Sequence, residues 1–478
     1  MFSARKLTLF QLNDSHGYLE PHQELFWSGD HNECRMAGGY ARVASLMEET
    51  SRVTPALAFD CGDTFHGTYL PVKSRGRAML PITNALAFNA MTAHWEFAYG
   101  PAGFRSLAKE LNYPVLAINC YEVDTGELAY APFTILERGG LLVGVIGIAS
   151  SIVDKVMPHQ FSDGLRFTSG REELPFYIMQ LQQERVDLII VISHLGFPQD
   201  MKLAREVQCV NIWLSGHTHN RLCRPEYVNG AALIQSGCHG SFLGRIDLEV
   251  EGGRVNIRSH KLAPVSLDVA PHPEVEELIR REMQPHRDFL DEVVGCTRTC
   301  LNRNTIMEST MDNFLLQSLI DLTGAEVAFC NGWRFGAPVP GGPITANDLY
   351  NIIPMNPPVS RVLLTGREIW SMMEENLERT FSRDPSQQMG GYVKRCLGLN
   401  LYFKVENPPN TRIQELFIRG HRLQPDRIYT AAFVTEQGVP LKYGTNRMDL
   451  EVRAVEAMER FLAKGRVKAD LMGSIVAV

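Results

Sequence analysis

Two histidines separated by one residue, His217 and His219, follow a strongly apolar segment. They belong to the tetrapeptide Gly-His-Thr-His at residues 216–219, directly after the apolar run 210–214. We therefore expect them in the loop that ends a buried strand. A pair of histidines in a loop is by itself more often exposed than ligating. Two imidazoles at this spacing can nevertheless reach two different partners, which suits two metal ions sharing one site.

Aspartate and histidine also follow two strand-like segments near the N-terminus. Residues 6–12 alternate apolar and polar side chains and lead to Asp14 and His16. The apolar run 56–59 leads to Asp63, which follows a glycine. A carboxylate at a strand end can offer one oxygen to each of two cations. Each feature alone is equally compatible with an ordinary turn.

Two further histidines complete the pattern. His94 comes after a segment with helical spacing, and His194 follows residues 186–192, which are apolar enough to form a strand buried on both faces. Because open α/β sheets bind ligands at the carboxyl ends of their strands, we expect these side chains to meet. The predicted ligand set is Asp14, His16, Asp63, His94, His194, His217 and His219.

This mixture of imidazole and carboxylate favours zinc, manganese, iron or cobalt over calcium or magnesium, which prefer oxygen ligands. If Asp63 bridges, each of two divalent ions has four protein ligands and keeps a position for water. Such a centre is typical of hydrolases. Taken singly, each histidine is more readily explained by a structural role than by metal binding. The prediction rests on the occurrence of aspartate or histidine after several predicted strands.

Composition limits the remaining possibilities. A chain of 478 residues exceeds what one core usually holds, so two domains are expected. A net charge of -7 excludes the basic excess of nucleic-acid readers, and no apolar stretch reaches membrane-spanning length. Without a secretory h-region, a cytoplasmic location is expected. The ten cysteines show no framework, so we expect reduced, mostly buried thiols, Cys209 among them.

A proline-containing segment, residues 264–273, suggests a domain boundary. The predicted organisation is an α/β metal-binding domain at residues 1–270, a linker helix at 271–295 and a second α/β domain at 296–478. The linker is predicted as a helix because its charged residues have helical periodicity.

The motifs together resemble the calcineurin-like metallophosphoesterases, and the whole chain resembles their 5'-nucleotidase branch. The resemblance implies an N-terminal four-layer α/β/β/α sandwich and a C-terminal substrate-binding domain of the 5'-nucleotidase type. It also divides the ligands between two ions. Asp63 is shared, the first ion is held by Asp14, His16 and His219, and the second by His94, His194 and His217.

One segment departs from the family pattern. The family has Gly-Asn-His-Glu-Phe, with a catalytic histidine, where residues 93–97 read Ala-His-Trp-Glu-Phe. Counted back from Glu96, His94 takes the asparagine position and Trp95 the histidine position; counted forward, the register stays open. An indole cannot protonate a leaving group, and general acid catalysis contributes about 10²–10⁴-fold. Candidate substitutes are His66 and His239, and each could equally be an ordinary loop histidine.

The His-Trp-Glu-Phe form, together with Gln-Gln-x-Gly-Gly at residues 387–391, also resembles the SoxB thiosulfohydrolases. These offshoots of the same family cleave a sulfonate from a cysteine persulfide on a carrier protein. A thiol leaving group needs little protonation, so the loss of an acid makes chemical sense there.

In the second domain, Arg334 follows the predicted strand 325–330. The resemblance implies that this arginine binds the terminal anion of the substrate, which a guanidinium can hold in a bidentate manner. Phe381 and Tyr392 are candidates for contacting the substrate base, although their spacing differs from the family's aromatic pair.

The leading hypothesis is a hydrolase with two divalent ions (Mn, Zn, Fe or Co) that cleaves nucleotide phosphoesters, as a 5'-nucleotidase or a 2',3'-cyclic phosphodiesterase, by attack of metal-bound hydroxide. The candidate catalytic residues are His94, Arg334 and His239. The alternatives are a SoxB-like thiosulfohydrolase and a catalytically degenerate metal-binding or ligand-binding protein. The expected partner is a small anionic substrate, with no nucleic acid or membrane; metal identity, leaving group and oligomeric state are left open.

Overall fold

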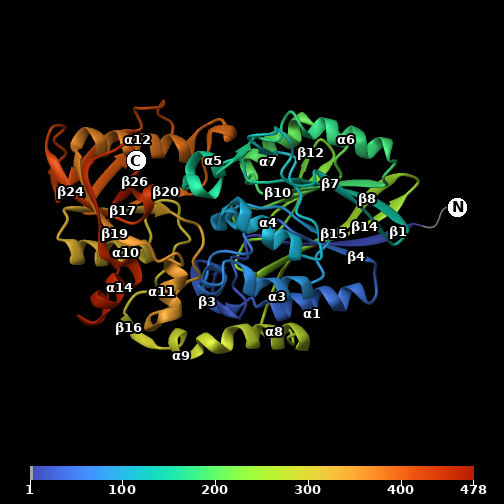
Figure 1. The fold of residues 1–478 in the computed structure, drawn as a ribbon, viewed down its shortest axis with the longest axis horizontal. Helices are drawn as coiled ribbons and strands as arrows, with labels where there is room; N and C mark the ends of the chain where they lie inside the picture. The colour runs from blue at the N-terminus through green and yellow to red at the C-terminus, as the bar shows by residue number, and fades with distance from the viewer. Residues whose placement is uncertain (1–3) are drawn as a thin grey trace. The chain divides into compact units, whose positions relative to one another are not determined.

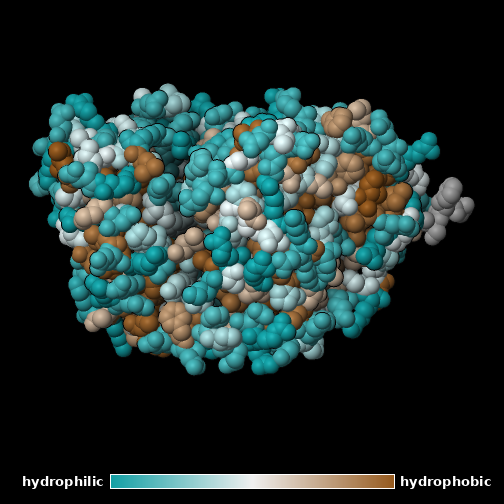
Figure 2. Space-filling model, in the orientation of Figure 1, coloured by the Kyte–Doolittle hydropathy of each residue, from teal (hydrophilic) through white to brown (hydrophobic). Residues whose placement is uncertain are grey.

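The computed structural model describes residues 4–478, which form two compact units (Figure 1). Among the described residues, unit 1 comprises 4–22 and Met36–Pro285, and unit 2 comprises Gln23–Arg35 and His286–Val478. None of the helices formed by residues 4–478 is long and apolar enough to cross a bilayer. Figure 2 shows a largely hydrophilic face on which apolar side chains lie in scattered groups.

Unit 1 contains two stacked β-sheets. The first has the order β15-β14-β1-β4-β5, and the second has the order β12-β13-β11-β10-β8-β7. The strands of the first sheet are β1 (Arg5–Leu12), β4 (Ala56–Asp60), β5 (Ala90–Met91), β14 (Phe242–Glu251) and β15 (Arg254–Pro264). The strands of the second sheet are β7 (Phe133–Arg138), β8 (Leu141–Ile148), β10 (Leu188–Ser193), β11 (Ile212–Ser215), β12 (Glu226–Val228) and β13 (Ala231–Ile234).

The inward faces of the two sheets form a continuous hydrophobic core. Leu7 and Leu9 of β1 contribute alternate side chains to it, as do Ile190 and Ile192 of β10. This period of two is the pattern expected when one face of each strand is buried against the other sheet. Burial of these branched side chains is the main term that stabilises unit 1.

Helices cover both outer faces. The first sheet carries α1 (Tyr40–Ser51), which packs on β1, β4 and α8 (Pro273–Met283). On the second sheet, α6 (Leu174–Gln183) and α7 (Phe197–Glu206) enclose a separate core around the fully buried Trp213. The layers therefore run α/β/β/α, and the predicted fold class is confirmed.

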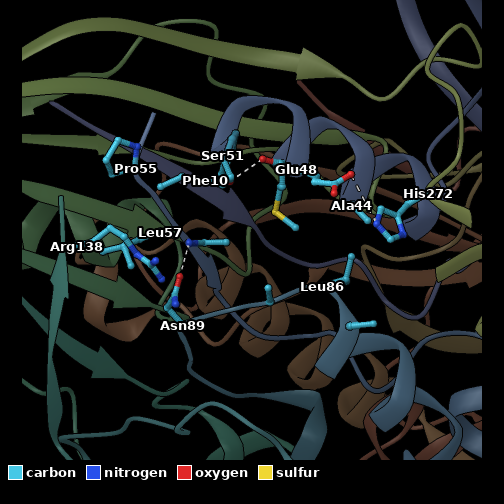
Figure 3. Close-up of a pocket in the computed structure, with 15 residues that line it drawn as sticks. Phe10, Ala44, Glu48, Ser51, Pro55, Leu57, Leu86, Asn89, Arg138 and His272 are labelled. Carbon is cyan, nitrogen blue, oxygen red and sulfur yellow. Dashed lines mark hydrogen bonds and ion pairs between the residues drawn. The ribbon is translucent and has the colours of Figure 1, made fainter. Parts of the chain in front are cut away.

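A cavity of about 320 Å³ remains between α1 and the first sheet (Figure 3). Small side chains line much of it, including Ala44 on α1 and Ala58 on β4. At one end, His272 Nε2 lies 3.7 Å from a carboxylate oxygen of Glu48. The alanines are too short to fill the space between the layers, so packing on this side is incomplete.

Unit 2 is built on a five-stranded sheet with the order β20-β17-β24-β19-β25. These strands are β17 (Val327–Gly332), β19 (Pro358–Thr365), β20 (Tyr392–Leu397), β24 (Ile428–Phe433) and β25 (Thr445–Arg453). A second sheet contains β21 (Leu399–Phe403), β22 (Ile413–Ile418), β23 (His421–Arg422) and β26 (Ile475–Ala477). The main helices are α10 (Thr310–Thr323), α12 (Gly366–Phe381) and α14 (Ala454–Leu462). Asp312 on α10 forms buried ion pairs with Arg303 and Arg395.

The predicted linker, residues 271–295, contains several short elements. The helix α8 is grouped with unit 1, whereas α9 (Arg287–Leu290) and the start of β16 (Val293–Thr297) are grouped with unit 2. Unit 2 also includes most of the hairpin formed by β2 (His22–Ser28) and β3 (His31–Ala37). This hairpin lies more than two hundred residues upstream of the rest of unit 2, and no sequence pattern indicated its place there.

Removing core volume from the first sheet should destabilise unit 1. Leu7→Ala, at a fully buried position, is expected to lower the free energy of unfolding by about 2–5 kcal/mol, because it removes buried methyl groups and leaves a cavity. Leu142→Ala, at a position 39% exposed, is the matched control and should change it by no more than about 0.5 kcal/mol. Urea titration of both variants measures the difference; equal effects would contradict the core assignment.

Candidate metal centre

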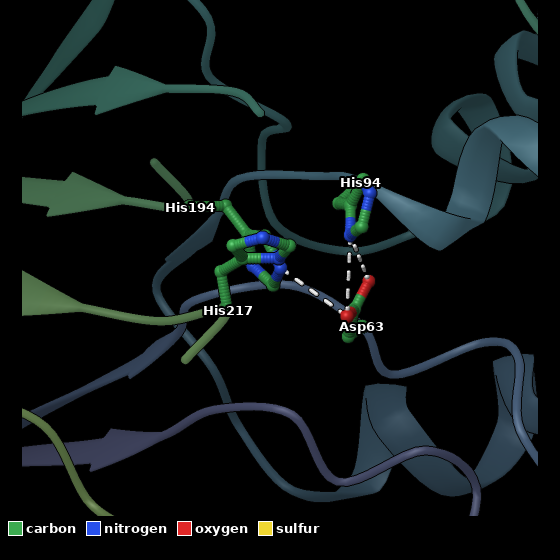
Figure 4. Close-up of side chains that lie close together, drawn as sticks. All are labelled: Asp63, His94, His194 and His217. Carbon is green, nitrogen blue, oxygen red and sulfur yellow. Dashed lines mark hydrogen bonds and ion pairs between the residues drawn. The ribbon is translucent and has the colours of Figure 1, made fainter. Parts of the chain in front are cut away.

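The loops after five strands of unit 1 bring the predicted side chains together. Each loop leaves the carboxyl end of a strand, and β1–β4, β4–β5, β8–β10 and β10–β11 are parallel pairs, so these ends lie at the same edge within each sheet. Two groups of side chains could each hold a metal ion, with all their ligand atoms within 4.8 Å of one another. They are Asp63, His94, His194 and His217 (Figure 4), and Asp14, His16, Asp63 and His219.

Asp63 lies at the junction of the two groups. Its Oδ1 atom is 3.1 Å from His94 Nδ1, and its Oδ2 atom is 3.2 Å from His194 Nε2. The same Oδ2 atom is 3.6 Å from His16 Nε2, in the other group. One carboxylate thus faces histidines of both groups, which is the arrangement a bridging ligand requires.

Hydrogen bonds to backbone carbonyls orient two of the imidazoles. His194 Nδ1 donates to the Cys61 carbonyl at 2.5 Å, and His16 Nδ1 donates to the His66 carbonyl at 3.0 Å. In both rings Nε2 is therefore the nitrogen that faces the carboxylates. Fixing the tautomer through the remote nitrogen is how proteins commonly hold histidine ligands to metals.

The backbone of the site adopts an uncommon conformation. Five of the seven predicted ligands have left-handed φ angles between 49° and 75°, a region that residues other than glycine rarely occupy. They are Asp14, His16, Asp63, His217 and His219. Such strain costs on the order of 1–3 kcal/mol per residue and is concentrated at functional sites. The surrounding fold therefore holds these loops against their local preference.

The buried carboxylate of Glu96 connects two of the loops, a role that sequence reasoning missed. It accepts hydrogen bonds from the backbone N–H of Thr64 at 2.7 Å and of His94 at 2.8 Å. Its side chain is fully buried. Gly62 allows the same loop to approach closely, because a Cβ there would lie 2.8 Å from His194 Nδ1. Glu96 thus fixes Asp63 and His94 relative to each other.

The buried charges of the site depend on one another. Burial alone would raise the pKa of Asp14, but His219 and His194 hold it below the usual value; His194 and His94 act likewise on Asp63. Burial alone would lower the pKa of His194, yet Asp63 and Asp14 raise it to about 10. Two ionised carboxylates are thus balanced by protons on imidazoles, and divalent cations could replace those protons. The donor set fits such ions.

Trp95 is adjacent in sequence to the predicted ligand His94, and its side chain packs on His66. Its indole stacks on the His66 imidazole, with ring centroids 4.6 Å apart and planes inclined by 17°. Its backbone N–H donates to Asp63 Oδ1 at 2.8 Å. Burial lowers the pKa of His66 to about 4, so this imidazole is neutral near pH 7 and carries no acidic proton to donate.

His239 borders the group that contains Asp14. Its ring centroid lies 6.1 Å from that of His219 and 6.3 Å from that of His16. The neighbouring Cys238 Sγ is 3.5 Å from His239 Nδ1. Burial would raise the pKa of Cys238, but His239 and His219 lower it to about 6. No sequence signal beyond the adjacent histidine pointed to this thiol.

The candidate substrate residues of unit 2 are only partly brought together. Arg334 Nη2 donates to the Gly391 carbonyl at 3.0 Å, and the guanidinium carbon lies 5.3 Å from the Tyr392 ring centroid. Phe381 instead packs against the hydrophobic core of unit 2, stacked on Phe403 with centroids 5.5 Å apart. The structure therefore places Arg334 and Tyr392 side by side, with Phe381 in a separate contact, and the substrate roles of all three residues stay predictions.

Comparison with known proteins identifies the class to which the fold corresponds. Residues 292–435 match the family model of the 5'-nucleotidase C-terminal domain. The chain is 22% identical to protein UshA of Escherichia coli over 481 residues, covering 89% of this chain and 84% of UshA. It is 25% identical to the 5'-nucleotidase of Bos taurus over 463 residues, covering 86% and 78%. It is 24% identical to the trifunctional nucleotide phosphoesterase YfkN of Bacillus subtilis, but spans only 30% of that longer protein.

Two solved structures share the fold over almost the whole chain. The sulfate thiohydrolase SoxB of Thermus thermophilus superposes with a TM-score of 0.91 at 23% identity, covering 99% of this chain and 96% of SoxB. A 5'-nucleotidase precursor from Thermus thermophilus superposes with a TM-score of 0.85 at 24% identity, covering 99% of both chains. The resemblance predicted from the sequence motifs is confirmed, and the chain has the two-domain fold of these proteins.

If Asp63 serves both groups, replacing it should affect both ions. We expect Asp63→Asn to lose most of the metal retained by the wild type, because one bridging negative charge is removed from both groups. Asp247→Asn, at a partly buried carboxylate on β14, is the control and should keep the wild-type content. Elemental analysis after manganese loading and desalting measures the ratio. Wild-type metal content in Asp63→Asn would refute the shared role.

Metal uptake should depend on pH with a defined sign. The raised pKa values, about 10 for His194 and about 9 for His219, mean that both imidazoles hold protons at neutral pH in the metal-free protein. Each ion must displace these protons, so apparent affinity should increase as pH rises from about 6 to 9. Competition with a chromophoric chelator across this pH range measures the apparent metal affinity. An affinity that does not change with pH, once the chelator's own pH dependence is subtracted, would contradict this prediction.

Proposed function

We propose that this protein is a metal-dependent hydrolase that cleaves the phosphoester of a nucleotide. The observation that carries the proposal is the pair of buried four-residue groups that share Asp63. Similarity to UshA and to a 5'-nucleotidase supports the nucleotide class of substrate. Manganese, zinc, iron or cobalt are the ions that suit the imidazole and carboxylate donors.

Two divalent ions in these groups would supply Lewis-acid stabilisation and a water activated for attack. The protein's own residues then have distinct roles. Asp63 would be shared by the two groups, and Glu96 would keep the loops of Asp63 and His94 in register. Arg334 would clamp terminal oxygens of the substrate, with its guanidinium held beside Tyr392. His239, at the border of one group, is the candidate for contacting the reacting oxygens.

The leaving group is where this site differs from a typical nucleotidase. Trp95 occupies the position beside His94, and its indole has no acidic proton to give. The imidazole stacked on it, His66, is neutral because burial lowers its pKa to about 4. Substrates whose leaving group is a weak base should therefore react faster than alkyl esters, whose departing oxygen needs a proton.

The same Trp95–His66 stack favours a second candidate function. A thiosulfohydrolase cleaves a sulfonate from a cysteine persulfide and expels a sulfur leaving group that needs little protonation. The superposition on SoxB, described as a sulfate thiohydrolase, supports this alternative at the level of the fold. Both candidates use the same metal ligands and differ in the group that departs.

Four substrates distinguish the candidates. Manganese-loaded protein would be assayed with AMP, a 2',3'-cyclic nucleotide, an activated aryl phosphate and an S-sulfonated cysteine peptide. Turnover of AMP that is lost in Arg334→Ala would support the nucleotidase. Reaction of the S-sulfonate alone would support the SoxB-like activity. Full metal content with no turnover of any substrate would leave a degenerate metal-binding protein and overturn the hydrolase proposal.

Replacing Trp95 tests the account of the leaving group. We expect Trp95→His to increase AMP turnover by up to about 10²-fold, because an imidazole at this position can protonate the departing alkoxide. Trp95→Phe, which keeps an aromatic ring without a proton donor, is the matched control and should show no gain. The ratio of AMP to aryl phosphate kcat/KM reports the effect. A fall in this ratio for Trp95→His would contradict the proposed role.

A further inference from the structure

Two thiols that are distant in sequence face each other in unit 2. Cys34 lies on β3 of the hairpin, and Cys300 precedes α10. Their Sγ atoms are 3.7 Å apart, although 266 positions separate them along the chain. Nothing in the sequence separation of the two cysteines indicates this pairing, which is a product of the fold.

Local structure fixes the backbone on both sides of the pair. The Cys300 carbonyl accepts a hydrogen bond from Thr310 Oγ1 at 2.7 Å. The next residue, Leu301, exchanges backbone hydrogen bonds of 2.8 and 2.9 Å with Val339. On the hairpin, the Arg35 guanidinium lies 4.1 Å from the centroid of the Phe26 ring. A disulfide holds its two sulfurs about 2.05 Å apart, so the Sγ atoms must move closer together before the bond can form.

We propose that Cys34 and Cys300 are a site of reversible disulfide formation that fastens the N-terminal hairpin to the remainder of unit 2. The bond would close a covalent ring from residue 34 to residue 300. That ring contains Met36–Pro285 of unit 1, and with it Asp63 and four of the other predicted metal ligands. Such a bond restricts the unfolded chain, an effect that grows with the length of the closed loop.

The reaction needs a disulfide oxidant, for which oxidised glutathione is the chemical class. The exposed Cys300 thiolate attacks one glutathione sulfur and releases a glutathione thiolate. The half-buried Cys34 thiolate then attacks the Cys300 sulfur of this mixed disulfide and releases the second glutathione thiolate. Two protein thiols are oxidised, one glutathione disulfide is reduced to two glutathiones, and the protein's two protons end on glutathione or solvent.

The environment of the sulfurs determines how fast this occurs. Burial of the sulfur raises the pKa of Cys34, and burial together with Cys34 raises the pKa of Cys300 to about 12. Both thiols are therefore protonated at neutral pH. Since the thiolate is the nucleophile, the cross-link should form slowly near pH 7 and faster at pH 9.

Peptide mapping tests the site directly. Fully reduced protein would be incubated with oxidised glutathione, quenched with acid, alkylated and digested for mass spectrometry. We expect a peptide that joins Cys34 to Cys300 in the wild type, lighter than the sum of its parts by two hydrogen atoms. Cys209→Ser removes an exposed thiol outside the pair and should leave the cross-link unchanged. Cys34→Ser and Cys300→Ser should abolish it and leave the remaining thiol as a glutathione adduct or free.

A stability measurement gives a second readout that does not require hydrolytic activity. Oxidation should raise the urea midpoint of the wild type and of Cys209→Ser, but not that of Cys34→Ser. The proposal is overturned if wild-type Cys34 and Cys300 are recovered as free thiols or as separate glutathione adducts after incubation at pH 9. It is equally overturned if either cysteine is found joined to another partner such as Cys296.

Discussion

The structure of unit 1 depends on how two buried carboxylates are neutralised. Asp14 and Asp63 are almost fully removed from water, and burying an uncompensated charge costs several kcal/mol. The fold surrounds them with imidazoles, whose protons or replacing cations supply the opposite charge. Backbone hydrogen bonds to Glu96 join the Asp63 and His94 loops, and five of the ligand-bearing residues have left-handed backbone conformations.

The parallel strands provide the geometry that this charge balance needs. Residues after β4, β10 and β11 leave the sheets at their carboxyl ends, and the hydrophobic core between the sheets holds those ends in place. The strand pattern was predictable because alternating and continuous apolar runs report burial directly. The seven candidate ligands were predictable for the same reason: each follows a recognisable element. Their role as metal ligands remains a prediction, whereas their proximity is a property of the structure.

Other features depend on contacts between distant segments, which periodicity does not encode. The hairpin that contains Cys34 is grouped with a unit whose other residues begin at His286. Glu96 reads as one acidic residue in a short motif, yet it receives backbone hydrogen bonds from two loops. Cys209 was expected to be buried and is exposed, because it lies in the loop between the end of α7 at Glu206 and the start of β11 at Ile212. Phe381 stacks on Phe403, a contact that the sequence did not indicate, and its contact with the substrate base stays a prediction.

The central claim is that Asp63 joins two metal sites, and X-ray diffraction from manganese-loaded crystals at the manganese absorption edge tests it most directly. We expect two anomalous peaks, one among Asp63, His94, His194 and His217 and the other among Asp14, His16, Asp63 and His219, each within bonding distance of the Asp63 carboxylate. A single peak, or two peaks of which only one contacts Asp63, would contradict it.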